Sequence, residues 1–232
     1  MDCNIVILPP RRMGTPRRRL FGRNGFTLIE LLVVVSIMVL VALFVAPAVV
    51  GVFRGSNLTQ AAQLVSGQLD LARQSAITQN HTVEVFFYQY ADPSVPGQNT
   101  ANSNTWTFQA VQSFVISDTG AVSPLGKVET LPSGIIMDSG PTLSSLFDPA
   151  KRTYSTNPTT ALPRAGKNYA YFSMRFYPNG STDLSPTING VNEPWCLTLH
   201  SAQSGDKLAV APANFWTILI DPINGGLAGF HP

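Results

Sequence analysis

Three residues near the start of the chain, Gly25, Phe26 and Glu30, have the types and spacing that could support processing chemistry. Gly25 and Phe26 lie between an arginine-rich segment and a long uncharged run, so a peptidase cut between them would leave a free amine on Phe26. Glu30 lies at the start of that run, where a carboxylate needs a partner or a role. A local role is open to it, because Thr27 and Glu30 have capping-box spacing and an acid in the first turn complements the helix dipole.

The segment around these residues resembles the cleavage and methylation motif of type IV pilins and type II secretion pseudopilins. It reads Gly25-Phe26-Thr27-Leu28-Ile29-Glu30-Leu31-Leu32-Val33-Val34. In that family the prepilin peptidase cuts after the glycine and methylates the new N-terminus, so the resemblance implies cleavage after Gly25 and N-methylation of Phe26. It also implies an assembly role for Glu30, which would pair with the terminal amine of a neighbouring subunit. Pro47 lies where many pilins have a proline, and it would kink the helix by removing a backbone donor.

Two other processing signals fit the same region less well. Ala46-Pro47-Ala48 has the small-x-small pattern of a signal peptidase site, and Arg18-Arg19 resembles a twin-arginine signal. A secretory apolar region is about 7 to 15 residues long and has no internal acid, unlike the longer run here. Twin-arginine signals also tend to be less hydrophobic. Cleavage after Gly25 is therefore the favoured interpretation.

The uncharged run from Leu31 to Phe53 has 23 residues, of which sixteen are Leu, Ile, Val or Phe. As a helix it would be about 35 Å long, against a hydrocarbon core of about 30 Å. Its apolar side chains favour insertion by about 5 to 10 kcal/mol, whereas one carboxylate costs about 3 kcal/mol. We therefore expect residues 26–54 to form a single transmembrane or filament-core helix.

Positive charge is concentrated in the first 25 residues. That segment has six arginines and one aspartate, a net charge of +5, so the rest of the chain must have a net charge of −3 to give the total of +2. Cationic flanks stay in the cytoplasm, which places the C-terminal domain in the periplasm or outside the cell. We therefore expect residues 1–25 to be a cleaved leader, 26–54 to lie in the cytoplasmic (inner) membrane before filament assembly, and 55–232 to be an exported domain. No excess of positive charge remains there to suggest a nucleic-acid partner.

The sequence pattern predicts no catalysis, cofactor or metal site. His81, His200 and His231 are isolated, and neither a Gly-x-Ser-x-Gly elbow nor a phosphate-binding loop is present. The carboxylates are widely spaced, so acid–base pairing would depend on the fold. Cys196 is the only cysteine outside the leader and has no intramolecular disulfide partner there. We therefore expect a non-enzymatic protein that is stabilised by packing.

The exported region reads as one helix followed by several strands. Apolar residues at three- and four-residue steps predict a helix with one buried stripe. The stripe consists of Leu58, Ala61, Val65, Leu69, Ala72 and Ala76. Each predicted strand is rich in β-branched or aromatic residues and is bounded by turn residues. The predicted strands are 82–90, 105–116, 131–137, 169–177, 195–200 and 215–221.

The region between the third and fourth predicted strands, residues 138–168, has little periodicity and is expected to be a surface segment. Trp106, Trp195 and Trp216 could line a binding face, but they are expected in the core, because aromatic residues on strands are more often buried than exposed.

A second set of short patterns resembles minor pseudopilins of the GspH and FimT type and the pilin-like cassette proteins of Verrucomicrobia. The patterns are Leu69-x-x-Ala72-Arg73-x-x-Ala76 before a Val-x-Val strand, Leu131-Pro132, Phe176-x-Pro178-x-Gly180, and a final Ile-x-Ile strand with a glycine turn. This resemblance implies an α+β fold in which a long N-terminal hydrophobic helix packs its C-terminal half on an antiparallel β-sheet.

Three functions remain open from the sequence. The chain could be a minor subunit that initiates or caps a type IV pilus-like filament or a type II secretion pseudopilus, a major subunit of such a filament, or a signal-anchored exported binding protein. The resemblance favours the minor subunit. Its implied partners are the prepilin peptidase, other pilin-like subunits, the inner-membrane assembly platform and the lipid bilayer.

Overall fold

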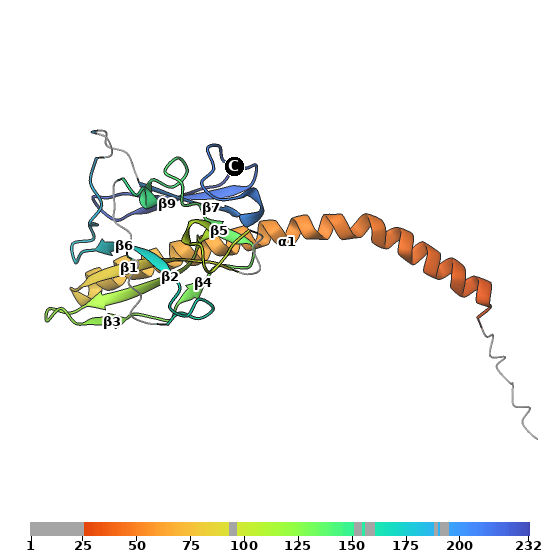
Figure 1. The fold of residues 1–232 in the computed structure, drawn as a ribbon, viewed down its shortest axis with the longest axis horizontal. Coiled ribbons are helices and arrows are strands. Elements are labelled where there is room, and N and C mark those ends of the chain that lie inside the picture. Colours follow the sequence, from red (N-terminus) through yellow and green to blue (C-terminus); the bar gives the residue numbers. More distant parts are fainter. Residues whose placement is uncertain (1–25, 93–96, 151–154, 156–160, 188–189, 191–194) are drawn as a thin grey trace, which may run out of the picture. The chain divides into compact units, whose positions relative to one another are not determined.

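The computed structural model describes residues 26–92, 97–150, 155, 161–187, 190 and 195–232 (Figure 1). For residues 44–54 it describes the backbone alone. The chain divides into two compact units, Met1–Pro47 and Ala48–Pro232. This division falls before the predicted boundary between residues 54 and 55, and that boundary stays a prediction.

A long helix, α1 (Leu28–Gln79), is the first element of the chain. It ends before Asn80, which has a positive φ of 54°. Asparagine tolerates this left-handed conformation, which is typical of the residue that terminates a helix. The backbone of α1 is helical through Pro47, and the kink expected at this residue stays a prediction.

The apolar stripe predicted from the sequence is the buried face of α1 in the second unit. All six of its side chains are at most 1% exposed, while Gln63, Asp70 and Gln74 on the opposite face are exposed. Four small or β-branched positions in the stripe let the helix backbone approach the strands closely. The C-terminal half of α1 thus packs on a sheet, and the predicted α+β architecture is confirmed (Figure 1).

In the described residues the sheet has nine strands, all paired antiparallel. The main path has the order β6-β1-β2-β5-β7-β8-β9, and β3 and β4 also pair with β2. The strands are β1 (Thr82–Tyr90), β2 (Thr107–Ile116), β3 (Val122–Pro124), β4 (Glu129–Thr130), β5 (Ile135–Met137), β6 (Ala170–Phe176), β7 (Trp195–Ser201), β8 (Phe215–Ile220) and β9 (Leu227–Phe230). Five of the six predicted strands are present with small shifts of their ends, and of the predicted strand 131–137 only the last three residues form β5. The short strands β3, β4 and β9 were not predicted.

Alternation along β1 separates the two faces of the sheet. Val83, Val85 and Phe87 belong to the main core with the stripe of α1. Tyr88 and Tyr90 belong to a second, smaller cluster. Because successive side chains of a strand point to opposite faces, this second cluster lies on the face of the sheet that α1 does not cover.

The first part of residues 138–168 is buried, so its prediction as a surface segment is wrong. A short 3₁₀ helix, η2 (Ser145–Phe147), places Leu146 and Phe147 fully in the core, and the ring of Phe147 stacks 4.0 Å from that of Phe108. Hydroxyl groups tie this segment to β7, because Ser144 Oγ accepts from the Thr198 amide at 3.0 Å and Ser145 Oγ accepts from the Cys196 amide at 2.9 Å. Bonds between hydroxyl groups and distant backbone amides do not require apolar residues at regular steps, so the sequence of this segment shows no periodicity. Residues 151–154 and 156–160 of the predicted segment lie outside the described residues.

Of the three tryptophans, only Trp195 is fully in the core as predicted. Trp216 is half-buried and packs against the core, and Trp106 is half-buried with its indole nitrogen donating to the Asn99 carbonyl oxygen at 3.0 Å.

Candidate functional site

The start of α1 carries the motif residues, and Thr27 caps it. Thr27 Oγ1 accepts a hydrogen bond from the Glu30 amide at 3.2 Å, and the Thr27 carbonyl oxygen accepts from the Leu31 amide at 3.1 Å. A threonine in this position satisfies one of the amides that the first helical turn leaves without a partner. The sequence therefore fixes the helix start two residues after Phe26.

The carboxylate of Glu30 is exposed and has no hydrogen bond or ion pair with any residue that the structure describes. A capping box has two hydrogen bonds, one from the Glu30 amide to the Thr27 hydroxyl and one from the Thr27 amide to the Glu30 carboxylate. The described contacts include only the first. The cap thus leaves the carboxylate free to accept from another group. A donor group from a second helix, or a terminal amine, would suit it. A carboxylate beside an apolar surface is stabilised most by a charged partner.

The side chains from Leu31 to Leu43 are exposed around the whole helix, and all of them except Ser36 are apolar. Phe26 is 78% exposed and Leu28 83%, and every residue from Phe26 to Leu43 is exposed. An exposed apolar surface of this extent on one chain marks a site that lipid or other protein covers. Helices that are hydrophobic all round are buried in membranes or in large assemblies.

The other predicted sites are described only in part. Gly25 lies outside the described residues, and the side chain of Pro47 does as well. Among the residues that the structure describes, no helix is both long enough and apolar enough to cross a membrane. The predicted span of residues 26–54 includes residues 44–54, whose side chains are outside the described part of the chain.

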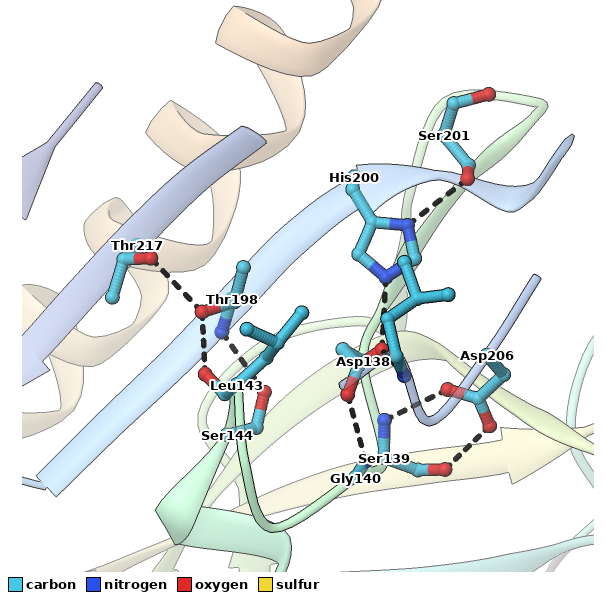
Figure 2. Close-up of polar contacts among 11 residues, drawn as sticks. Asp138, Ser139, Gly140, Leu143, Ser144, Thr198, His200, Ser201, Asp206 and Thr217 are labelled. Atoms are coloured by element: carbon cyan, nitrogen blue, oxygen red, sulfur yellow. Dashed lines mark hydrogen bonds and ion pairs between the residues drawn. The ribbon is translucent and has the colours of Figure 1, made fainter. Parts of the chain in front are cut away.

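The histidine that looked isolated in the sequence, His200, has a partner in the fold. Its Nε2 lies 3.0 Å from Asp138 Oδ2, and its Nδ1 lies 3.0 Å from the Ser201 carbonyl oxygen (Figure 2). Asp138 and His200 are fully buried. The two residues are 62 positions apart, so no local spacing could have paired them.

Further bonds saturate Asp138 and connect it to a neighbouring loop. Asp138 Oδ1 accepts from the Gly140 amide at 2.8 Å and Oδ2 accepts from the Leu208 amide at 3.2 Å. The adjacent Ser139 donates its amide to Asp206 Oδ1 at 2.8 Å and its hydroxyl to Asp206 Oδ2 (Figure 2). The network therefore clamps the segment after β5 to residues 206–208. Both carboxylate oxygens of Asp138 accept hydrogen bonds, and the Asp138–His200 pair is closed to solvent. These properties suit a structural role.

The remaining candidate groups are dispersed. His81 Nδ1 lies 3.3 Å from Asp118 Oδ1, and His231 Nε2 lies 3.2 Å from Asn214 Oδ1. In the described part of the chain, no group of three or more His, Cys, Asp or Glu residues could hold a metal ion. The candidate site is thus the apolar segment with Glu30 at its start, where the carboxylate needs a partner and the apolar surface needs to be covered.

A comparison with models of protein families matches residues 20–46 to the prokaryotic N-terminal methylation motif. The chain carries this methylation motif. The matched residues include Gly25, Phe26, Glu30 and the first part of α1. The free carboxylate of Glu30 and the exposed apolar surface up to Leu43 lie within the matched residues.

Two solved structures resemble the chain over 76% of its length. One is the minor pseudopilin EpsH from the Type 2 Secretion System of Vibrio cholerae, with 12% identity over 76% of this chain and 98% of that chain and a TM-score of 0.38. The other is the type IV minor pilin FimU of Pseudomonas aeruginosa, with 11% identity over 76% of this chain and 93% of that chain and a TM-score of 0.40. A comparison with curated proteins gave no match. Because both TM-scores are low, the function proposed below depends on the methylation motif and on this chain's own geometry.

Proposed function

We propose that the chain is a non-enzymatic pilin-like subunit that is cut after Gly25, methylated on Phe26 and assembled into a type IV pilus-like filament or a type II secretion pseudopilus. In this proposal a prepilin peptidase processes the chain in the cytoplasmic membrane, with the C-terminal domain on the periplasmic or extracellular side. Assembly then occurs on an inner-membrane platform with other pilin-like subunits. The resemblance to minor pseudopilins favours a minor, initiating subunit over a major one.

The observation that carries this proposal is the combination of an all-round apolar helix surface and a carboxylate without a partner, both inside the methylation motif. In lipid, the isolated carboxylate of Glu30 is costly. In a bundle of related helices, the amine of Phe26 from a neighbouring subunit would pair with it and relieve that cost. The residue that penalises the free subunit would thereby select the correct axial register in the filament.

The domain's own stability supports a role as a subunit that survives transfer between environments. The main core joins the stripe of α1 to both halves of the sheet without a disulfide, because Cys196, the cysteine that the structure describes, is free. The exported unit therefore does not depend on the exposed apolar segment for its packing.

Mass spectrometry of the N-terminus from membrane fractions tests the proposal. We expect a mature chain that begins with N-methylated Phe26. Gly25 replaced by a bulky residue should leave the precursor uncut in the membrane, because the peptidase must accommodate the residue before the cut. A mature chain that begins at Val49, after the Ala46-Pro47-Ala48 site, would contradict the pilin-like function and favour an exported binding protein.

The same preparations separate a minor from a major subunit. A major subunit should dominate filaments sheared from the cell surface, whereas a minor subunit should be present at low copy number beside a more abundant pilin-like protein. Quantitative mass spectrometry of sheared filaments measures this ratio.

A further inference from the structure

The face of the sheet that α1 does not cover carries an aromatic groove, which we define by Phe86, Tyr88, Gln112, Phe114, Tyr169 and Tyr171, with walls from β3 and residues 161–162. Its volume is about 510 Å³. Pockets that bind small molecules typically have volumes of about 300 to 1,000 Å³. The groove is therefore large enough for a ligand of two or three fused rings.

The floor of the groove is a set of rings in contact. Phe86 and Tyr171 stack at 4.8 Å with an angle of 14° between their planes, and Phe114 lies 4.8 Å from Phe86. Tyr169 meets Tyr88 edge-on at 5.5 Å. Phe86, Phe114 and Tyr171 are half-buried, so part of each ring surface remains available. A further planar ring that enters the groove could make favourable stacked or edge-to-face contacts with these rings.

Four of the side chains that line the groove are polar, those of Tyr88, Gln112, Tyr169 and Tyr171, and two of these are bonded to each other. Tyr88 donates its hydroxyl hydrogen to Gln112 Oε1 at 3.1 Å, and Gln112 Nε2 donates to the Gly126 carbonyl oxygen at 2.9 Å. Burial, followed by the neighbouring Tyr169 and Tyr171, raises the pKa of Tyr88, so its hydroxyl stays neutral. A ligand with many hydroxyl or amide groups would leave most of them without partners, at a cost for each group.

The charge of the groove also limits its occupant. Among the residues that the structure describes, none of the side chains that line the groove carries a charge at neutral pH. A charged ligand would lose hydration there without meeting an opposite charge, which is unfavourable. The lining is complementary to a neutral, planar and largely apolar group.

We propose that this groove is a binding site for a neutral small molecule that carries a planar aromatic ring system. The site is separate from the N-terminal motif and does not require filament assembly. A failure of the cleavage experiment above would therefore leave the groove proposal intact, and the reverse also holds.

Three probes with the same ring and different charge test the proposal: neutral indole, anionic indole-3-acetate and cationic tryptamine. Equilibrium dialysis of each probe against the purified full chain, with matched detergent blanks, measures the dissociation constants. We expect saturable binding of indole and about ten-fold weaker binding of both charged probes, because their charge must be desolvated in a neutral groove. No saturable binding of indole, or equal binding of all three probes, would overturn the proposal.

A charge placed at the wall of the groove locates the bound probe. Val122 on β3 lines the groove and is 55% exposed, so Val122→Lys should leave the fold intact. This variant should bind indole more weakly and indole-3-acetate more tightly than the unmodified chain. Val210→Lys adds the same charge at an exposed residue outside the lining and should change neither constant. Identical behaviour of the two lysine variants would show that the probe binds elsewhere and would overturn the site.

The neutral disaccharide cellobiose checks the chemical class of the ligand. Its many hydroxyl groups have few free partners in the groove, so it should not displace indole. Displacement of indole by cellobiose at comparable concentration would assign the groove to glycans and overturn the proposed class.

Discussion

His200 and Asp138 form a fully buried contact in which imidazole Nε2 lies 3.0 Å from carboxylate Oδ2 (Figure 2). The second ring nitrogen, Nδ1, lies 3.0 Å from the Ser201 carbonyl oxygen, which can only accept a hydrogen bond. Because both ring nitrogens face acceptors, the ring must donate from both, and only the protonated imidazolium can do so. This geometry favours the charged form of His200.

This arrangement predicts a stability that depends on pH. Burial alone lowers the pKa of His200, but the bonds to Asp138 and Ser201 and the charges of Asp138 and Asp206 outweigh it and raise the pKa above the ordinary value of 6.5. The contribution of the pair is therefore fully present below pH 6.5 and is lost as the pH rises through the higher folded-state pKa.

The variant His200→Asn measures that contribution. Removing one partner of a buried pair should lower the free energy of unfolding by about 3 to 5 kcal/mol at acidic pH, and by less at alkaline pH. Urea unfolding of the fragment that begins at Gly55, over a series of pH values, gives the difference at each pH. His231→Asn is the control, because His231 is exposed. A difference between His200→Asn and the unmodified fragment that grows as the pH rises would show that His200 is neutral in the fold, and a difference that does not change with pH would show that its pKa is not raised.

A charge on the buried face of α1 should unfold the same fragment. Val65 and Leu69 are 0% exposed, and the described residues of the main core to which they belong are hydrophobic. We expect Val65→Asp or Leu69→Asp to cost several kcal/mol, because an unpaired charge would be buried. Gln63→Glu on the exposed face is the control and should be nearly neutral. Thermal melts compare the three variants, and equal melting temperatures would show that the stripe does not face the core in solution.

Two glycines should respond in opposite directions to the same substitution. Gly225 has a φ of 66°, and a Cβ atom there would lie 2.5 Å from the Gly180 carbonyl oxygen and 3.0 Å from the Phe176 ring. Gly225→Ala should therefore lower the free energy of unfolding by about 1 to 3 kcal/mol. Gly67 lies within α1 with open space around it, so Gly67→Ala should raise that free energy by about 0.5 to 1 kcal/mol.

Urea unfolding of the two alanine variants measures both effects under the same conditions. A loss of stability in Gly67→Ala would show that this part of α1 needs the flexibility of glycine. No loss in Gly225→Ala would show that the turn after β8 can move away from Gly180.

The sequence predicted the elements whose information is local. The stripe of α1 follows from a helical period and the strand β1 from alternation, and both are found as predicted. The start of the helix also followed from Thr27, since a cap depends on residues within one turn.

The parts that the sequence did not predict depend on contacts between distant residues. The pairing of His200 with Asp138 and the burial of Phe147 require β5, β7 and η2 to be placed first. The short strands β3 and β4 have two or three residues each, too few to show alternation, and they exist because the edge of β2 offers them partners. The aromatic groove was missed for the same reason. Its rings come from separate strands that only the fold brings together.

The last prediction separates the two roles that remain for the start of α1, helix capping and subunit assembly. Thr27 supplies the cap through its hydroxyl, while the carboxylate of Glu30 has no partner in the described part of the chain. Thr27→Ala should therefore cost about 1 kcal/mol of local helix stability and leave cleavage and assembly in place.

Glu30→Ala should also be cut after Gly25, but the subunit should stay in the membrane and not enter filaments, because the neighbouring amine would lose its acceptor. Glu30→Gln keeps the shape without the charge and should also fail to assemble if the contact is an ion pair. The mass of the N-terminus reports cleavage, and the fraction of the subunit in sheared filaments reports assembly. Normal assembly of Glu30→Ala, or an equal defect in Thr27→Ala, would show that this end of the helix needs only its cap.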